Sequence, residues 1–323
     1  MVRFKEIEDE IKQHDRFVLA SHFSPEADAI GSQLGLNRVL RRMGKETIMT
    51  NQDALPRNLS FLKGSSGICR PGEVQREVRN ADICIVLDCG SLDRVGKQTL
   101  NLIEDLPIIN IDHHPDNPGF GYLNYIEDVA ATTQIIYNLI QYMGFNIDSP
   151  LATALYAGII ADTTSFRNDN VRPETLEVAA DLLDRGADFR AIAINLYERS
   201  PFKKQKLLGR VLADAEFQDK IVWGTITQDL MAETETTSED TEGIIQHLRT
   251  TEGALVAILF KELPNGKVKV SMRAKGRTNV SEIAKGFGGG GHAKAAGFMV
   301  KSSLKAAKRQ VLEVTRRRLR DDQ

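Results

Sequence analysis

The sequence predicts an α/β protein with a parallel sheet in its first part and a smaller mixed α/β domain in its second part. Short apolar runs alternate with helical patterns through the first half, as they do where helices connect parallel strands. Several of these runs are apolar on both faces, which is typical of strands in a parallel sheet. The 323 residues also exceed the usual size of one domain. We therefore expect helices on both faces of the first sheet and an active site in the cleft between the two domains.

Hydrophobic spacing predicts the elements of the first half. Residues 16–20 (RFVLA) form an apolar run of strand length, and apolar residues recur at helical spacing over 28–43 until Gly44 ends the pattern. Further strands are predicted at 83–87 and 107–111, and further helices at 131–143, 150–161 and 173–185.

The order of elements changes in the second half. Residues 191–215 are helical in pattern and rich in Arg and Lys, so we interpret them as a linker between a catalytic domain at 1–190 and a second domain at 216–323. The second domain is predicted to contain a strand at 220–227, a helix at 241–249, strands at 254–260 and 267–272, a glycine-rich loop and a long C-terminal helix. The Asn-Gly pair between the last two strands predicts a hairpin.

Bulk composition excludes several classes of protein. No apolar run approaches the roughly 20 residues that cross a bilayer, and the first residues are too charged for a secretory signal. Three cysteines without metal-site spacing indicate a reducing, cytoplasmic setting. A net charge of −2 argues against binding to long duplex nucleic acid, but it allows a small anionic substrate.

Acidic and imidazole side chains follow three of the predicted strands. His22 comes after the first strand, Asp88 after the strand at 83–87, and Asp112-His113-His114 after the strand at 107–111. The carboxyl ends of neighbouring parallel strands face one crevice, so these residues should converge, together with Asp162 after an apolar helix. Each of them alone could cap a helix or bond to the backbone, but the set at such positions favours a common site.

Divalent cations are the expected partners of such a set. Carboxylates that are gathered without cations repel one another and raise each other's pKa values. A mixture of Asp and His suits Mn²⁺ or a similar ion, and two ions that share one carboxylate would fit a hydrolytic site.

Four ordered motifs give the chain a specific resemblance to a known family. The segment from His22 to Ser32 (HFSPEADAIGS) resembles the first motif of the DHH phosphoesterase superfamily, H-x-x-P-D-x-D-A-x-G-S, with Glu26 at one Asp position. The segments 88–91 (DCGS), 112–114 (DHH) and 161–166 (ADTTSF) resemble the other three motifs. Within the superfamily the chain is similar to the bacterial branch of NrnA-type oligoribonucleases (nanoRNases) and adenosine bisphosphate phosphatases.

The resemblance implies a role for each matching residue. It implies two Mn²⁺ ions per chain, with Mg²⁺ or Co²⁺ as alternatives, and ligands from two sets: His22, Glu26 and Asp88 for one ion, and Asp28, Asp88, His113 and Asp162 for the other. Asp88 would bridge the ions, His114 would face the scissile phosphate or leaving oxygen, and Asp112 would orient the histidines. Glu26 moves its carboxylate further out than Asp would, which puts the first ion site in question.

A glycine-rich segment predicts an anion site in the second domain. Consecutive glycines let backbone N–H groups converge on a phosphate, and a helix beginning after them would add its dipole. Without its neighbours, such a run would only be a flexible turn. It is followed by His292, and Arg273 precedes it on a predicted strand, a pairing that resembles the DHH-associated domain. The resemblance implies that Arg273, Gly289, Gly290, Gly291 and His292 bind the substrate.

These inferences together predict a metal-dependent phosphodiesterase. We expect it to hydrolyse very short RNA or DNA oligonucleotides to mononucleotides and to dephosphorylate adenosine 3′,5′-bisphosphate, without a membrane partner and as a homodimer. One alternative is a phosphodiesterase for a cyclic dinucleotide (c-di-AMP) or its linear product. Another is a nucleotide-binding sensor whose catalysis was lost through Glu26. A Rossmann dehydrogenase is excluded because no G-x-G-x-x-G follows the first strand.

Overall fold

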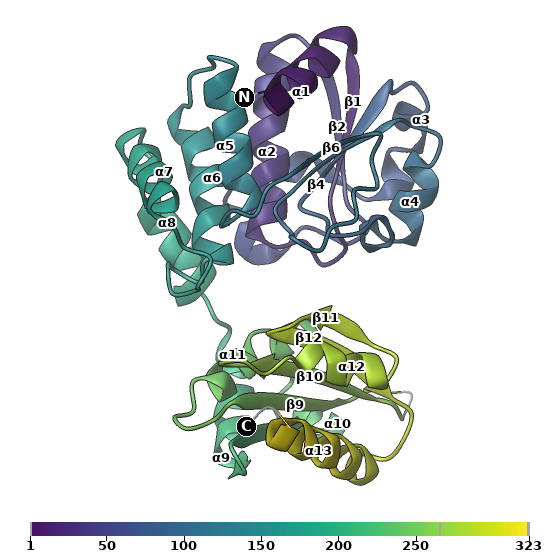
Figure 1. Ribbon diagram of the computed structural model, residues 1–323, viewed down its shortest axis with the longest axis vertical. Coiled ribbons are helices and arrows are strands. Elements are labelled where there is room, and N and C mark those ends of the chain that lie inside the picture. Colours follow the sequence, from purple (N-terminus) through teal and green to yellow (C-terminus); the bar gives the residue numbers. More distant parts are fainter. Residues whose placement is uncertain (1, 265, 322–323) are drawn as a thin grey trace. The chain divides into compact units, whose positions relative to one another are not determined.

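A computed structural model describes residues 2–264 and 266–321 of the chain (Figure 1). It divides into two compact units, one that ends at Arg199 and one that begins at Ser200. The limits predicted for the catalytic domain and the linker, at residues 190 and 216, stay predictions. No helix in the described ranges is both long and apolar enough to cross a membrane.

The first unit is built on a sheet of parallel strands in the order β3-β2-β1-β4-β5-β6. The strands are β1 (Arg16–Ala20), β2 (Glu46–Thr50), β3 (Ile68–Cys69), β4 (Ile83–Leu87), β5 (Ile108–Asp112) and β6 (Leu123–Ile126). The predicted strands at 16–20 and 83–87 are confirmed, and the third begins one residue later than predicted. The strands β2, β3 and β6 were not predicted, because β2 mixes polar and apolar residues, β3 is very short and β6 is only half-buried.

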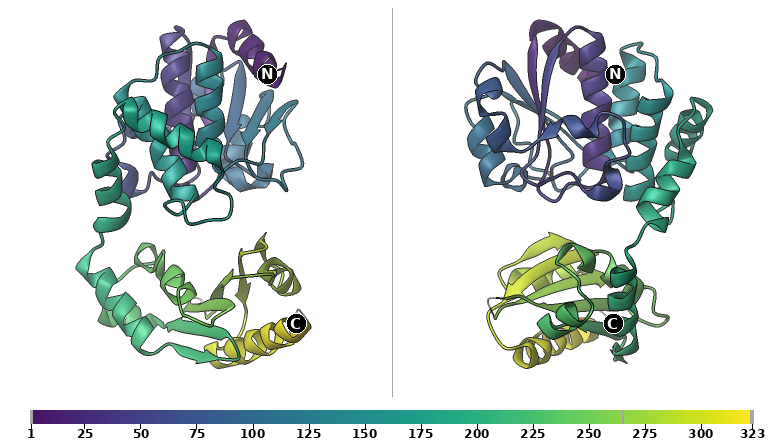
Figure 2. Two further views of the ribbon diagram at one scale, coloured as in Figure 1. Left: turned by 60° about the vertical axis from the view of Figure 1, so that its left-hand side comes forward. Right: turned by 180° about the vertical axis from the view of Figure 1, so that it is seen from behind.

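Helices cover both faces of this sheet, as predicted (Figures 1 and 2). Phe17 and Leu19 of β1 belong to the core beneath the helices α1 (Val2–Gln13), α2 (Ala27–Arg42), α5 (Thr132–Tyr142) and α6 (Ser149–Asp162). Val18 and Ala20 point to the opposite face, where α3 (Gln75–Val78) and α4 (Lys97–Ile103) complete a second core. Helices α7 (Pro173–Asp184) and α8 (Phe189–Ala193) and a π-helical turn (Ile194–Glu198) follow.

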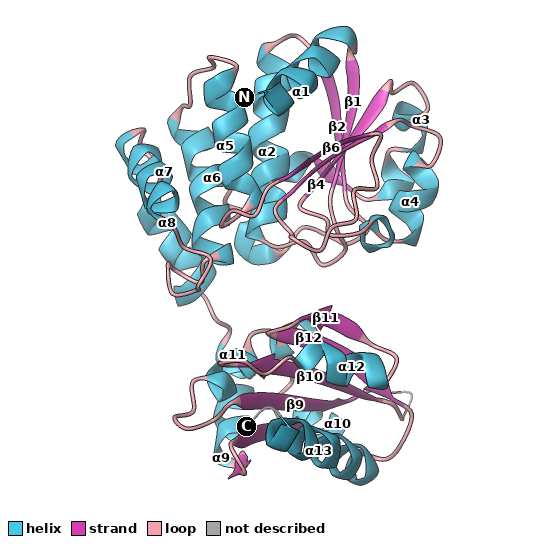
Figure 3. Cartoon of the chain, viewed as in Figure 1, coloured by secondary structure: helices cyan, strands magenta, loops and turns pink. Residues whose placement is uncertain are grey.

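The second unit contains one mixed sheet in the order β11-β12-β10-β9-β8-β7 (Figure 3). Its strands are β7 (Glu216–Gln218), β8 (Ile221–Ile226), β9 (Val256–Glu262), β10 (Val268–Ala274), β11 (Gly290–His292) and β12 (Ala295–Val300). Only β8 and β9 pair in parallel; the other described pairs are antiparallel. Helices α9 (Phe202–Ala213) and α11 (Ile244–Arg249) pack on one face, and α12 (Val280–Gly286) and α13 (Leu304–Asp321) on the other. The short helix α10 (Gln228–Glu233) follows β8.

The glycine-rich segment differs from its prediction. The strands β9 and β10 do pair as the predicted hairpin, although Asn265 in its turn lies outside the described residues. The expectation of a helix directly after the glycines is wrong, since they lead into the hairpin of β11 and β12. Every second residue of β12 (Ala296, Phe298 and Val300) is buried, as in a strand with one face on the core, and a side chain at Gly289 would overlap the backbone of Phe298.

Candidate active site

The candidate site lies where the chain path through the first sheet reverses. From β1 the sheet continues through β2 and β3 to one edge, and from β4 through β5 and β6 to the other. This reversal opens a crevice at the carboxyl ends of the strands, where open α/β sheets bind ligands. His22 follows β1, Asp88 follows β4 directly, and Asp112 ends β5. The strand order thus brings together residues that are far apart in the sequence.

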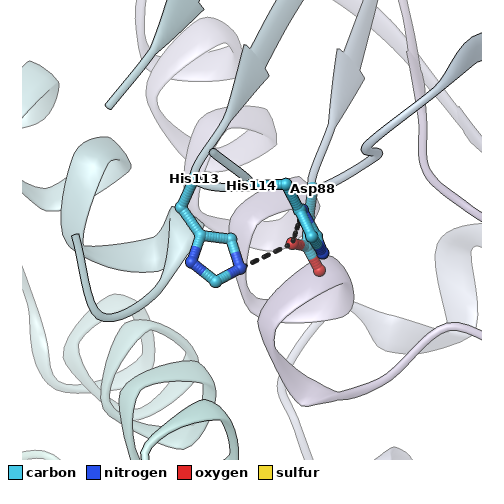
Figure 4. A group of neighbouring side chains, drawn as sticks. All are labelled: Asp88, His113 and His114. Atoms are coloured by element: carbon cyan, nitrogen blue, oxygen red, sulfur yellow. Dashed lines mark ion pairs between the residues drawn. The ribbon is translucent and has the colours of Figure 1, made fainter. Parts of the chain in front are cut away.

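Asp88 is at the centre of the site. Its carboxylate lies 3.5 Å from His22 Nε2, 3.6 Å from His113 Nε2 and 3.9 Å from His114 Nδ1. Figure 4 shows His113 and His114 directed at this carboxylate from the loop after β5. The backbone of Asp88 has a φ of 54°, in the left-handed region that non-glycine residues rarely adopt. Such a conformation is unfavourable by itself, and it often marks a functional position.

Two histidines are oriented by hydrogen bonds to backbone carbonyls. His22 Nδ1 lies 2.7 Å from the carbonyl of Phe23, and His113 Nδ1 lies 3.1 Å from the carbonyl of Val129. A carbonyl can only accept a hydrogen bond, so the proton of each neutral ring is on Nδ1. In the neutral ring Nε2 then carries the lone pair that can bind a metal ion, and backbone contacts of this kind orient the imidazoles of metal sites.

A separate set of contacts orients His114. Its Nδ1–H donates to Asp112 Oδ1 at 2.7 Å, and Asp112 Oδ2 accepts from the amide of Asn117 at 2.6 Å. The same amide donates to the carbonyl of Cys89 at 3.1 Å, and Asp112 is fully buried. Asp112 is thus placed to orient His114 rather than to face an ion. Asn117 was not predicted, because nothing in its local sequence indicates a contact with Asp112.

A second group of possible ligands consists of Asp28, His113 and Asp162, whose ligand atoms all lie within 4.8 Å of one another. Asp28 comes from the first turn of α2 and Asp162 from the last residue of α6. The backbone N–H groups of Thr132 and Thr133 donate to Asp28 at 2.6 and 2.8 Å, and the hydroxyl of Thr133 donates at 2.6 Å. These threonines were not predicted either, because the sequence shows only two hydroxyl residues at the start of a predicted helix.

The electrostatics of both groups indicate a site that lacks positive charge. Burial, together with the charge of Asp88, raises the pKa of Asp28 to about 6. Burial and the charge of Asp28 raise the pKa of Asp162 well above its ordinary value. Burial opposes protonation of His113, yet the surrounding carboxylates, first that of Asp162, raise its pKa to about 9.

Asp88 shows the opposite shift. Burial would raise its pKa, but the hydrogen bond and charge of His22 and the charges of the other two histidines hold the pKa well below its usual range. Without a cation, these shifts favour the protonated forms of Asp28, Asp162 and His113. A divalent cation would replace those protons, so these side chains fit a metal ion.

Glu26 is the most exposed of the predicted ligands, at the start of α2. The two groups of possible ligands among the described residues are Asp88, His113 and His114, and Asp28, His113 and Asp162, so neither Glu26 nor His22 belongs to them. The charge of Glu26 still acts on the site, because it helps to raise the pKa of Asp162.

The predicted substrate residues lie in the second unit. Arg273 in β10 is opposite Ala295 of β12, and Ala295 is opposite His292 of β11, so the register places both residues in one row. Arg273 Nη1 donates to the carbonyl of Met272 at 3.0 Å. Gly290 and Gly291 belong to β11, and Gly289 precedes it. The side chain of His292 is outside what the structure describes.

A doubly wound sheet with Asp and His ligands at its point of reversal defines an α/β protein suited to binding a cation. The DHH family, N-terminal domain, matches residues 16–159, and the DHHA1 domain matches residues 220–321. One relative, from Thermus thermophilus, is 35% identical and aligns over 93% of this chain and 89% of its own length. The chain belongs to the DHH family, as its motifs predicted.

The relatives carry informative names. The Thermus thermophilus protein is a bifunctional oligoribonuclease and PAP phosphatase NrnA. A Bacillus subtilis protein of the same name is 26% identical over 90% of this chain and 91% of its own. A crystal structure of an exopolyphosphatase-related protein from Bacteroides fragilis has a TM-score of 0.92 at 24% identity, and covers 98% of this chain and 96% of that one. The similarity to this crystal structure shows the fold alone.

Proposed function

We propose that this protein is a metal-dependent phosphodiesterase that hydrolyses very short oligonucleotides to mononucleotides and dephosphorylates adenosine 3′,5′-bisphosphate. The observation that carries the proposal is the group around Asp88, with three imidazoles within 3.9 Å of its carboxylate. The Thermus thermophilus relative, 35% identical, bears both activities in its name. A modest net charge of −2 also suits a small substrate better than a long one.

Two Mn²⁺ ions are the proposed cofactors. The residues that would hold them are His22, Glu26 and Asp88 for one ion, and Asp28, Asp88, His113 and Asp162 for the other. When bound, such ions polarise a phosphoryl oxygen and stabilise the charge that develops in hydrolysis. The raised pKa values of Asp28 and Asp162 support this assignment, because they reflect carboxylates without enough cations.

His114 is the proposed proton donor to the leaving oxygen. Its Nδ1–H is fixed on Asp112, so in the protonated ring Nε2–H is the group that can act on substrate. Asp112 and Asn117 hold the ring at one angle and so reduce the reorganisation that proton transfer requires. In the second unit, Arg273, His292 and the backbone of Gly289, Gly290 and Gly291 would bind the phosphate of the substrate.

Hydrolysis of a labelled dinucleotide with Mn²⁺ tests the proposal. We expect rapid cleavage by the natural chain and a loss of more than about 100-fold in Asp88→Asn, because the Asp88 carboxylate lies near all three imidazoles of the site. Asp105→Asn is the matched control, since Asp105 is exposed on the surface of the same unit. Adenosine 3′,5′-bisphosphate, a cyclic dinucleotide and a 24-mer are assayed in parallel.

The other outcomes would change the assignment. Faster turnover of the cyclic dinucleotide would make that compound the substrate. Binding of nucleotide without cleavage of any compound, in protein with fewer than two ions per chain, would favour a sensor.

A further inference from the structure

An exposed aromatic ring lies next to the first histidine of the site. Phe23 follows His22 directly, so their Cα atoms are about 3.8 Å apart, and 43% of the phenylalanine is exposed to solvent. Exposed apolar residues are common and carry no meaning alone. The contacts around Phe23 indicate whether its exposure has a functional reason.

The loop that carries Phe23 is held in place from three sides. Its backbone N–H groups donate to other segments: Ser21 to Asn51 Oδ1 at 3.0 Å, Phe23 to the Arg94 carbonyl at 2.7 Å, and Ser24 to Asp53 Oδ2 at 2.8 Å. Ser24 also has a φ of 52°, in the left-handed region. A conformation that is unfavourable in itself is thus maintained by its neighbours. Such pre-organisation reduces the cost of binding a ligand.

Arg94 supports the ring from one face. Its guanidinium carbon lies 5.8 Å from the ring centroid, within the range of a cation–π contact. Among the residues that the structure describes, no carboxylate forms an ion pair with Arg94, which leaves its guanidinium available to the ring.

We propose that Phe23, supported by Arg94, is a stacking platform for a base of the substrate, with preference for purines. The inference rests on the proposed function, because a nucleotide whose phosphate reaches Asp88 would carry its base past His22 and its neighbour. Aromatic side chains bind bases through their π-faces, and a purine offers the larger face.

A contact between Phe23 and another protein surface is the competing explanation of its exposure. A protein contact would affect all substrates alike, because it does not depend on the base. A stacking platform would instead distinguish adenine from uracil. Base dependence is therefore the property to measure.

The experiment compares diadenosine and diuridine dinucleotides as substrates, and it measures the binding of AMP and UMP by calorimetry with Mn²⁺ present. In Phe23→Ala we expect the KM for the adenine dinucleotide and the Kd for AMP to rise by about 5- to 150-fold. The uracil compounds should change less, and kcat should stay within about threefold because the chemistry is untouched. Phe23→Tyr, which keeps the ring, should restore adenine binding. Phe217→Ala, at a 53% exposed aromatic of the second unit, is the matched control.

Several results would overturn the inference. Equal changes for adenine and uracil compounds would indicate a structural or protein-contact role, and unchanged adenine binding would remove any role. If the natural chain hydrolyses neither dinucleotide, the proposed function fails, but the AMP and UMP titrations still decide whether Phe23 binds a base.

Discussion

His113 is the residue whose charge depends most on its neighbours. Its Nε2 lies 3.2 Å from Asp162 and 3.6 Å from Asp88, and the surrounding carboxylates raise its pKa from 6.5 to about 9. A raised pKa in the folded state stabilises the fold below pH 6.5, and this contribution is lost as the pH rises to about 9. Without metal, we therefore expect the free energy of unfolding to fall between pH 6.5 and 9, by at most about 3 kcal/mol.

Denaturant unfolding in a chelating buffer measures this effect. The variant His113→Asn should show a smaller decline, because only His22 and Asp162, whose pKa values are also raised, still lose protons as the pH rises. Saturating Mn²⁺ should reverse the trend in the natural chain, because an imidazole binds metal in its neutral form. An equal decline in His113→Asn would show that other groups cause it.

The ligands of the candidate site could be recognised at the residue scale, but their supporting contacts could not. His22, Asp88 and His113 follow apolar runs, and this position in the chain is visible in the sequence. Thr133 and Asn117 act through contacts that only the tertiary structure creates. The departure at Glu26 was visible, yet the sequence could not show that this side chain is exposed.

The close packing of α2, α5 and α6 positions Asp28. A methyl group at Gly158 in α6 would lie 2.7 Å from Asp28 Oδ1 and would also overlap Thr133. We expect Gly158→Ala to destabilise the protein by about 1–3 kcal/mol because the helices must separate. It should also raise the Mn²⁺ concentration for half-maximal activity by about 10- to 100-fold, because Asp28 loses its orienting contacts.

Thermal unfolding and metal titration of activity test this prediction. Gly209→Ala in α9 is the matched control, since nothing lies within 4 Å of a side chain there. It should be stabilised by up to about 1 kcal/mol, as alanine is favoured over glycine inside helices. A Gly158→Ala protein with unchanged metal dependence would show that Asp28 is not positioned by this packing.

Elements could be predicted where burial makes the hydrophobic pattern strong. The strand β4 is apolar and buried at every position, and its predicted limits are those of the structure. The strand β6 has four half-buried residues, and β3 has only two residues, so their patterns are too weak to detect. The hairpin of β11 and β12 could not be predicted, because glycines give β11 no side-chain pattern. Close approach of the backbone determines this strand instead.

The residues with proposed roles are distributed over both units of the molecule. The candidate metal ligands all belong to the unit that ends at Arg199, whereas Arg273 belongs to the unit that begins at Ser200. Their assignment to one reaction rests on the resemblance of the second unit to the DHH-associated domain, because spacing in sequence contains no information on how two units meet. The contribution of the second unit is therefore best tested in solution.

We expect Arg273→Ala to raise the KM for a dinucleotide by about 10- to 100-fold with little change in kcat. The reason is that a charge-assisted contact to phosphate would strengthen the binding of the substrate and of the transition state alike. Steady-state kinetics with Mn²⁺ measures both constants. Lys269→Ala is the matched control, because Lys269 is exposed on the same strand and on the same face as Arg273. Metal content should be unchanged in both variants, since the ligands lie in the first unit. If neither KM nor kcat changes in Arg273→Ala, this residue is not part of the substrate site. A lower kcat at unchanged KM would instead indicate that the arginine acts only in the transition state.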